Sequence, residues 1–305
     1  MIIIRLMGGL GNQMQQYALY RKFISLGKEA CLDTSWFVHE ASRTDTPRKL
    51  ELDRFVSADF EAADEAAVKS VISPGILSRI RTKLNPASSR YIHENSMYQP
   101  GIFDMDDCLL EGYWSADKYY ADILPDLREK FDFAPMLDAD PAKKTQLEEV
   151  KKAIDAAPFS CSVHIRRGDY LKPGISDLFG GVSTEEYYET AFSYIREEHP
   201  DVKFFIFSDD PEYVADKYGE AADCTAIDVN HGPDSLFDIY LMSLCDAHIC
   251  ANSSFSFWGA RLDTRREEAL CIRPAIHMRS QRFDEDLMHD LWKNWILIDP
   301  EGKFR

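Results

Sequence analysis

The sequence predicts an α/β protein built from two parallel sheets with helices on their faces. Short runs rich in β-branched and aromatic residues alternate with stretches of helical spacing through the second half of the chain. This alternation indicates a parallel sheet that is buried on both sides. The first half opens with the same order of strand, turn and helix. The length of 305 residues suits two domains of about 150 residues each.

The first half begins with a strand expected over Ile2–Leu6, which is followed by a turn that contains three glycines. Apolar residues then recur on one side of a helix expected over Asn12–Leu26. A second strand is expected over Ala30–Leu32. Residues 40–110 show a less regular pattern than the rest of the chain.

The second half is more regular, and its elements follow one another with short connections. We expect strands at Ser162–Arg166, Val202–Phe207, Thr225–Val229, His248–Ala251 and Ala269–Ile272. We expect helices at Ser183–His199, from Pro211 onward, at Ser235–Cys245 and at Ser254–Leu262. Ser183, followed three residues later by Glu186, has the form of a capping box at the start of the first of these helices.

A polar stretch around Asp138–Ala157 marks the expected boundary between the two halves. We therefore expect domains at residues 1–152 and 153–305. Each would be a Rossmann-like half, and the two would face each other over a cleft. In open α/β sheets, ligands bind beyond the carboxyl ends of the strands, so polar residues at those ends are the candidates for a site.

The composition is that of an ordinary globular protein with a strongly acidic balance. Lys and Arg total 35 against 52 Asp and Glu, which gives a net charge of −17. Such a chain is a poor candidate for binding duplex nucleic acid, whose phosphates need many cationic partners. Clustered cations could still bind one nucleotide. Seven scattered cysteines without a CxxC pair favour reduced core thiols over disulfides or a metal site.

No apolar run approaches the ~20 residues that a membrane-spanning helix needs. The opening MIIIRLMGG has too few apolar residues for the ~7–15-residue core of a signal peptide. We therefore expect a cytoplasmic protein. A local basic stretch could form a solvated surface, or it could contact an anionic acceptor or a lipid head group. Peripheral contact with the inner face of a membrane therefore stays open. This stretch consists of Arg79, Arg81, Lys83 and Arg90.

The strongest candidate site follows the first strand of the second half. Strand alternation points His164 and Arg166 to one face. Arg166 and Arg167 together form a strong site for a pyrophosphate, because guanidinium groups bind oxygens in pairs. Gly168 lets a ligand approach the backbone, and Asp169 could hold an arginine in place or accept a proton. A structural salt bridge at a domain edge is the alternative.

A hydroxyl-rich segment follows a later strand and opens a helix. Asn252, Ser253 and Ser254 would present free backbone N–H groups and the positive end of the helix to a phosphate. Plain capping by Asn252 or Ser253 is the alternative. The aromatic residues that come next favour the core over ligand stacking, and only Phe255 among them stays a candidate contact.

Polar side chains follow two more strands. Ser208 and Asp209 come after one strand and Asp228 comes after the next, where they could accept hydrogen bonds from a base or a ribose. Capping of the helix that starts at Pro211 is the alternative. Asp238 lies inside the following helix, where a buried structural role explains it as well as ligand contact does.

A glycine-rich turn after the first strand of the chain includes Gly11, Asn12 and Gln13. Close approach of a ligand would let Asn12 and Gln13 orient a sugar. Gly9 and Gly11 also match the first two glycines of a dinucleotide-binding GxGxxG pattern, with methionine in the third position. Asp33 falls where the ribose carboxylate of that pattern would lie, so a dinucleotide site is a second interpretation.

Five motifs, taken in order, resemble bacterial α-1,2-fucosyltransferases of glycosyltransferase family 11, and the resemblance spans nearly the whole chain. The motifs are Met7–Met14, Gly112–Trp114, His164–Tyr170, Asp238–Ser243 and Asn252–Gly259. The arginine motif alone is also similar to that of α-1,6- and protein O-fucosyltransferases. Two positions depart from the family's usual pattern. Gln15 stands where the family usually has Phe, and Ser115 stands where it usually has Gln.

The resemblance implies a GT-B-like fold with an acceptor-side domain at 1–152 and a GDP-fucose-binding domain at 153–305. It implies inverting transfer of L-fucose from GDP-β-L-fucose to the 2-hydroxyl of a terminal β-galactoside. The reaction would serve cell-surface glycan synthesis, in O-antigen or capsule, and whether the glycan acceptor is lipid-linked stays open. By position, Arg166 would hold the donor β-phosphate beside His164, and Ser253 and Ser254 match the hydroxyl-rich helix start. Ser115 lies in the half that would hold the acceptor, so this departure concerns the acceptor preference more than the reaction.

The resemblance also implies that no metal cofactor is required. Two Asp-x-Asp triplets have a spacing that can bind a metal ion, but neither follows a clear hydrophobic strand, and the histidines show no HExxH spacing. These triplets are Asp104–Asp106 and Asp138–Asp140. Fixed positive groups would instead take up the charge on the departing phosphate.

The base that takes the proton of the acceptor hydroxyl is less well defined, and Asp169 and His164 are the candidates. Two interpretations from other classes stay open. The glycine pattern allows a nicotinamide-dependent oxidoreductase or epimerase, and the arginine site allows a non-catalytic module that binds a nucleotide or a glycan.

Overall fold

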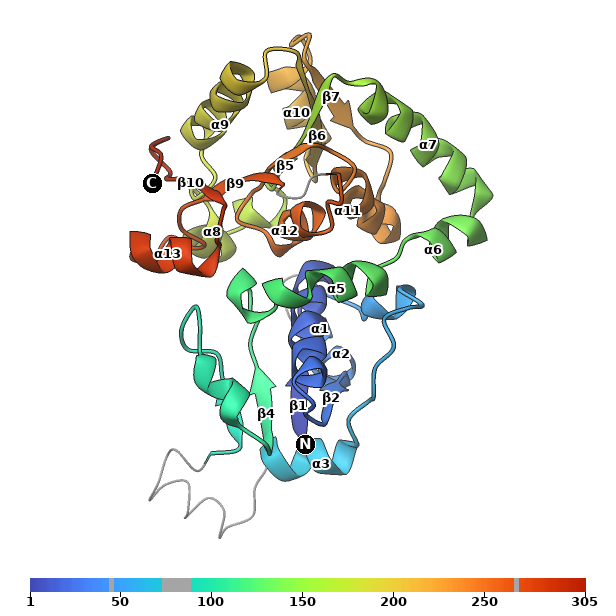
Figure 1. The fold of residues 1–305 in the computed structure, drawn as a ribbon, viewed down its shortest axis with the longest axis vertical. Helices are drawn as coiled ribbons and strands as arrows, with labels where there is room; N and C mark the ends of the chain where they lie inside the picture. The colour runs from blue at the N-terminus through green and yellow to red at the C-terminus, as the bar shows by residue number, and fades with distance from the viewer. Residues whose placement is uncertain (44–46, 73–88, 266–268) are drawn as a thin grey trace. The chain divides into compact units, whose positions relative to one another are not determined.

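The computed structural model describes residues 1–43, 47–72, 89–265 and 269–305 (Figure 1). Its chain divides into two compact units, Met1–Asp132 and Phe133–Arg305. Most of the basic stretch noted in the sequence (Arg79, Arg81 and Lys83) lies outside the described residues. Arg90 is described, and its guanidinium forms an exposed ion pair with Asp107 at 2.7 Å.

The N-terminal unit contains a four-stranded parallel sheet in the order β2-β1-β4-β3. Its strands are β1 (Ile2–Arg5), β2 (Ala30–Asp33), β3 (Tyr91–His93) and β4 (Cys108–Glu111). Its α-helices are α1 (Leu10–Ser25), α2 (Ser35–His39), α3 (Glu65–Ile72) and α5 (Leu124–Lys130). Short 3₁₀ helices lie at Ala41–Arg43, Leu52–Arg54, Pro100–Asp104, Asp117–Tyr119 and Ala121–Ile123.

The C-terminal unit contains a six-stranded parallel sheet in the order β10-β9-β8-β5-β6-β7. Its strands are β5 (Phe159–Ile165), β6 (Val202–Ser208), β7 (Cys224–Ile227), β8 (Ala247–Ile249), β9 (Leu270–Pro274) and β10 (Ile296–Ile298). Its α-helices are α6 (Ala134–Ala139), α7 (Pro141–Ala156), α8 (Ile175–Phe179), α9 (Glu185–Glu198), α10 (Pro211–Tyr218), α11 (Leu236–Met242), α12 (Ser254–Arg261) and α13 (Glu285–Leu291). Short 3₁₀ helices lie at Asp169–Leu171 and Gly232–Ser235.

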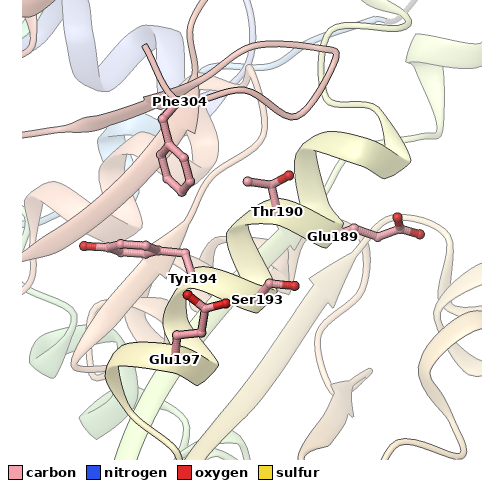
Figure 2. Close-up of a pocket in the computed structure, with 6 residues that line it drawn as sticks. All are labelled: Glu189, Thr190, Ser193, Tyr194, Glu197 and Phe304. Carbon is pink, nitrogen blue, oxygen red and sulfur yellow. The ribbon is translucent and has the colours of Figure 1, made fainter.

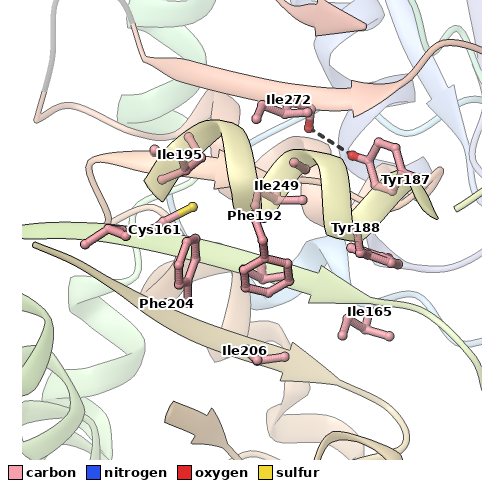
Figure 3. Packing of buried hydrophobic residues seen from close by; sticks show 14 of the residues in the cluster. Cys161, Ile165, Tyr187, Tyr188, Phe192, Ile195, Phe204, Ile206, Ile249 and Ile272 are labelled. Carbon is pink, nitrogen blue, oxygen red and sulfur yellow. Dashed lines mark hydrogen bonds between the residues drawn. The ribbon is translucent and has the colours of Figure 1, made fainter. Parts of the chain in front are cut away.

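Both units therefore confirm the predicted α/β class with two parallel sheets. Continuous apolar runs form the central strands because each strand is covered on both faces. In the C-terminal unit, α9 covers one face of the sheet (Figure 3). Its side chains Tyr187, Phe192 and Ile195 pack on alternate residues of the strands, which include Cys161 and Phe204.

A buried trio of hydrogen-bonded side chains joins the two central strands of the C-terminal sheet, on the face opposite to this cluster. Ser162 Oγ on β5 lies 2.8 Å from Nδ1 of His248 on β8, and Nε2 of the same ring lies 3.3 Å from Asp263 Oδ2. All three side chains are buried, with at most 2% of each residue exposed. Mutual hydrogen bonding satisfies groups that would otherwise be costly to remove from water.

The division between the units differs from the boundary expected at residue 152. The polar stretch read as a boundary forms α6 and α7, and α7 packs against α11 of the C-terminal unit. Asp140 caps α7 by accepting a hydrogen bond from Lys143 N at 3.0 Å, and Pro141 occupies the first turn. Only Leu147 and Ile154 of α7 are buried. Most of its residues are therefore polar and solvent-facing, so the sequence pattern does not indicate a helix.

The start of α9 lies one residue later than the capping box suggested. Thr184 is the cap, and its hydroxyl accepts a hydrogen bond from Tyr187 N at 3.1 Å while donating to Pro300 O. Ser183 instead donates to Asn252 Oδ1 at 3.1 Å. The local pattern assigned the cap to Ser183, but its hydroxyl forms a hydrogen bond with Asn252, which is distant along the chain.

The prediction of core thiols is confirmed, because none of the seven cysteines forms a disulfide and all but Cys224 are buried. Within the described residues, no helix combines the length and the apolar character that crossing a membrane would require.

We predict that Thr184→Ala lowers the free energy of unfolding by about 1 kcal/mol, the usual cost of losing a helix cap. Thr184→Ser keeps the hydroxyl and should stay close to wild type. Urea unfolding monitored by circular dichroism measures both. Equal stability of the Ala and Ser variants would contradict the role of the hydroxyl.

Candidate functional site

The carboxyl ends of β5 and β8 define the place in the C-terminal sheet where a ligand is expected. Chain order proceeds from β5 to β6 and β7 on one side, while β8, β9 and β10 lie on the other. The strand order thus reverses between β5 and β8. Crevices at such reversals are the general binding position in open α/β sheets. His164 and Arg166 lie at the end of β5, and Asn252 and Ser253 follow β8.

Arg166 has its guanidinium held by two carboxylates. Nε and Nη2 donate to Asp169 Oδ1 at 3.0 and 2.6 Å, and Nη1 lies 2.8 Å from Asp209 Oδ2. The arginine side chain is 24% exposed. Charge-assisted contacts on both sides fix the plane of the group, so Arg166 presents an oriented positive charge at the sheet edge.

Gly168 allows Asp209 to reach this position. A Cβ on Gly168 would lie 2.3 Å from Asp209 Oδ2, which is closer than atoms can approach. The other oxygen, Oδ1, accepts a hydrogen bond from Arg167 N at 2.9 Å. The sequence placed Asp209 against a base or ribose. In the structure its carboxylate contacts the arginine motif.

Arg167 differs from Arg166 in what it contacts. Its Nε donates to Asp210 Oδ2 at 2.8 Å, and its guanidinium lies over the ring of Tyr213, 3.8 Å from the ring centre. Asp210 also caps α10 by accepting from Tyr213 N at 3.1 Å, as the capping alternative predicted. The two adjacent arginines thus form separate contacts, and the structure gives no shared orientation for them.

His164 precedes Arg166 by two residues on β5 and is buried, with 5% of the residue exposed. Burial and the nearby Arg166 cation lower the pKa of its imidazole to about 4, although Asp209 opposes the shift. The ring lies beside that of Phe255, with centroids 5.5 Å apart. A neutral imidazole is therefore present at neutral pH, and Phe255 at the start of α12 covers it.

Asn252 connects the loops around the site. Its Nδ2 donates to Phe179 O at 3.1 Å and to His277 O at 3.0 Å, while its backbone carbonyl accepts from Tyr170 at 3.0 Å. The residue is 1% exposed. Tyr170 belongs to the arginine motif, so this bond joins the chain after β5 to the chain after β8.

Ser253 caps α12, and its Oγ accepts a hydrogen bond from Phe255 N at 3.4 Å. Ser254 is the first residue of the helix. The amide groups of this first turn and the helix dipole direct positive potential beyond the sheet edge. Capping and anion binding are compatible here, because one cap leaves other N–H groups of the turn to face a ligand.

The remaining candidates of this unit lie at the ends of β6 and β7. Ser208 Oγ accepts from Asp210 N at 3.0 Å. Asp228 is 52% exposed and lies 3.7 Å from His231. Asp238 accepts from Asn230 Nδ2 at 2.7 Å, and burial raises the pKa of its carboxyl to about 7. Asp238 is thus a buried hydrogen-bonded partner of the Asn230 amide.

The glycine-rich turn of the N-terminal unit is held by its own side chains. Gln13 Nε2 donates to Gly8 O and Lys49 O at 3.0 and 2.8 Å, and its Oε1 accepts from two backbone N–H groups of residues 51 and 52. Gly8 has φ 79° and packs on Asn12, whose Nδ2 would lie 2.7 Å from an added Cβ. Gly11 is buried in the first turn of α1.

Asp33 is not available as a ribose ligand of a dinucleotide. It is 2% exposed and accepts a hydrogen bond from Arg5 Nε at 3.0 Å. The Asp-x-Asp triplets also have protein partners. Lys28 pairs with Asp106 at 2.8 Å and Lys144 pairs with Asp138 at 2.7 Å. No group of three or more potential metal ligands is found among the described residues.

Glu94 shapes the Gly-Tyr-Trp turn after β4 and was not predicted from the sequence. Its carboxylate accepts hydrogen bonds from Tyr113 N at 2.7 Å and Trp114 N at 3.1 Å, and Trp114 adopts a positive φ of 52°. A Cβ on Gly112 would lie 2.4 Å from Glu94 Cβ. Nothing local marks Glu94, because its partners lie about twenty residues later along the chain.

A separate cavity of about 300 Å³ lies on α9 beside the C-terminal segment (Figure 2). None of the predicted site residues lines it. Its walls are Glu189, Thr190, Ser193, Tyr194, Glu197 and Phe304.

These features define a class of enzyme when they are set beside known proteins. The family model for glycosyl transferase family 11 matches residues 104–299. An α-1,2-colitosyltransferase of Escherichia coli is 34% identical over 277 residues, covering 86% of this chain and 87% of the relative. The O-antigen biosynthesis glycosyltransferase WbnK of Escherichia coli is 29% identical over 290 residues, covering 88% and 92%.

Among solved structures, the NodZ α-1,6-fucosyltransferase soaked with GDP-fucose shares 14% identity and a TM-score of 0.44, over 86% of this chain and 92% of that one. The family match and the 34% identity identify the protein as a glycosyltransferase. The chain belongs to glycosyl transferase family 11, so the resemblance seen in the sequence is confirmed at this level. The oxidoreductase interpretation is set aside.

We predict that His164 makes stability depend on pH below about 6.5. Its pKa is lowered in the folded protein, so the unfolded chain binds a proton that the folded chain rejects. The neutral His164 imidazole makes its full contribution to the free energy of unfolding above the ordinary histidine pKa. This contribution is lost as pH falls toward 4, at up to about 1.4 kcal/mol per pH unit. The free energy of unfolding, measured with urea at several pH values, should change less steeply with pH for His164→Asn than for the wild type. The same pH dependence in both proteins would contradict this role of His164.

Proposed function

We propose that the protein transfers L-fucose from GDP-β-L-fucose to the 2-hydroxyl of a terminal β-galactoside, with inversion at C1 and an α-1,2 linkage. The observation that carries the donor part is the oriented guanidinium of Arg166, which lies at the same strand-order reversal as the start of α12. A diphosphate bound there would receive hydrogen bonds from a fixed cation and from helix N–H groups.

The chemistry follows from where charge develops. As the bond from C1 to the β-phosphate oxygen breaks, negative charge grows on the nucleoside diphosphate. Arg166 is held by Asp169 and Asp209 before the reaction begins, so it needs little rearrangement to stabilise that charge. We propose that Arg166 and the α12 N-terminus replace a metal ion in this role, and that no metal cofactor is required.

Donor identity has a second candidate that a specific observation favours. The relative that is 34% identical is named an α-1,2-colitosyltransferase. Colitose is L-fucose without its 3-hydroxyl, so one site could accept either sugar if it makes no hydrogen bond to that hydroxyl. The name of the other relative, an O-antigen biosynthesis glycosyltransferase, supports a role in assembling a cell-surface glycan.

We predict that Arg166→Ala lowers turnover by about 10²–10³-fold, the usual cost of removing one preorganised charge-stabilising donor. Arg167→Ala should have a smaller effect, because Arg167 is stacked on Tyr213 and paired with Asp210. Steady-state rates with GDP-fucose and lactose measure both, and thermal melting checks that each variant folds. Near-normal turnover by folded Arg166→Ala would contradict the proposed role.

The proposed function is tested by offering GDP-fucose and GDP-colitose with a panel of β-galactosides, in buffer with and without EDTA. We expect a disaccharide linkage to the galactose 2-hydroxyl, identified by NMR, at a rate that EDTA leaves unchanged. Calorimetric titration should show binding of GDP and none of NAD. Loss of transfer in EDTA, or GDP binding without transfer of either sugar, would contradict the proposal.

A further inference from the structure

Tyr170, the last residue of the arginine motif, contacts both parts of the proposed donor site, although the chemistry above gives it no role. Its ring centre lies 5.8 Å from the guanidinium carbon of Arg166. Its phenol donates a hydrogen bond of 3.0 Å to the backbone carbonyl of Asn252, the residue before the α12 cap Ser253. One side chain therefore bridges the cation and the helix start that are proposed to bind the diphosphate.

The backbone of the motif itself places this ring beside Arg166. Asp169–Leu171 form a 3₁₀ turn directly after Gly168, and both Asp169 and Tyr170 contact the arginine that precedes them. A cation within about 6 Å of an aromatic ring centre is attracted by the negative face of the ring. The ring is thus a third neighbour of the guanidinium besides the two carboxylates, and it cancels none of the positive charge.

A second aromatic ring also holds Tyr170 in place. Phe179 ends α8, and its ring is stacked on that of Tyr170, with the two centroids 5.4 Å apart and the planes 20° apart. The backbone carbonyl of Phe179 accepts a hydrogen bond from Asn252 Nδ2 at 3.1 Å. Asn252 therefore contacts Tyr170 through its own carbonyl and Phe179 through its side chain. These contacts leave the tyrosine ring little freedom to move away from Arg166.

Asn252 is a rigid support for the phenol because its own polar groups are engaged within the protein. Besides Phe179, its Nδ2 donates to His277 O at 3.0 Å. Its Oδ1 accepts from Ser183 Oγ at 3.1 Å, and its backbone N donates to the same hydroxyl oxygen at 3.2 Å. Buried hydrogen bonds of this kind are costly to break. The carbonyl that receives the Tyr170 phenol therefore has a fixed position.

We propose that Tyr170 is a positioning residue of the donor site, which fixes the guanidinium of Arg166 relative to the N-terminus of α12. This inference rests on the proposed function. Tyr170 acts through Arg166 rather than on the reacting atoms. A diphosphate gains from both positive groups only if they face it at the same time, and a displacement of about 1 Å in such a site can cost a large part of the rate.

A tyrosine with a purely structural role near the same loop provides the comparison. Tyr187 on α9 belongs to the buried cluster of the C-terminal sheet and donates its phenol to Cys250 O at 2.6 Å. Cys250 precedes Asn252 by two residues, so both phenols end on carbonyls of the chain that follows β8. Of these two tyrosines, Tyr170 is the one that contacts Arg166.

The test compares Tyr170→Phe with Tyr187→Phe, since each change removes one hydrogen bond from a phenol to a carbonyl and keeps the ring. With GDP-fucose and lactose, kcat/KM for the donor should fall by about three- to tenfold for Tyr170→Phe, the range expected for one net hydrogen bond. GDP affinity, measured by calorimetric titration, should fall with it, while the KM for lactose should not change. Tyr187→Phe should keep wild-type donor kinetics, and thermal melting checks that both variants fold.

A double-mutant cycle on GDP affinity separates positioning from a general effect on the loop. In an Arg166→Ala background, Tyr170→Phe should lower the affinity further by less than about twofold, because the group that it positions is absent. Equal losses with and without Arg166, or wild-type donor kinetics in folded Tyr170→Phe, overturn this inference only. A wild-type chain that binds GDP but transfers neither fucose nor colitose overturns the proposed function, and the GDP cycle then still decides the role of Tyr170.

Discussion

The guanidinium of Arg166, held on two sides by Asp169 and Asp209, is the interaction on which the C-terminal site depends. A guanidinium has five N–H groups, and the two carboxylates engage Nε, Nη1 and Nη2 once each. Each terminal nitrogen therefore keeps a second N–H that can point at an anion. The carboxylates reduce the net charge of the group but fix its direction. A phosphate site gains more from a fixed cation than from a mobile one, since no reorganisation is needed on binding.

The same constraint explains several neighbouring residues. Gly168 has no side chain because Asp209 occupies the space a Cβ would take. Arg167 turns away to Asp210 and Tyr213, which separates two like charges that are adjacent in sequence. Tyr170 reaches Asn252 and so couples the arginine motif to the loop that precedes α12. One ion-pair arrangement thus determines the conformation of a whole motif.

Much of the fold followed from local signals, and the exceptions have identifiable causes. Strands β5 to β9 of the C-terminal sheet and the helix that starts with Ser254 were predicted to within a few residues, because periodicity and caps are local, whereas β10 was not predicted. The helix α7 was missed since only Leu147 and Ile154 of it are buried. Ser183 was chosen over Thr184 as a cap because its bond to Asn252 depends on tertiary structure that the sequence pattern cannot show.

The candidate site was predicted unevenly for the same reason. Arg166 and Ser253 could be found because strand ends and helix starts leave a pattern in the sequence. Glu94 could not, since it acts on backbone groups of residues that are distant along the chain. The strands β3 and β4 have three and four residues, too few for alternation to stand out from an irregular region.

The buried hydrogen-bonded trio between β5 and β8 has the residue types of a catalytic site without its accessibility. Ser162, His248 and Asp263 are the three side chains that many hydrolases use, and here they lie in hydrogen-bonding order. The ring is reversed, since Nδ1 faces the serine, and no more than 2% of any of the three residues is exposed. A nucleophile that no water or ester can reach performs no hydrolysis. The three side chains therefore resemble a catalytic triad in residue type alone, and their burial gives them the structural role of joining two strands.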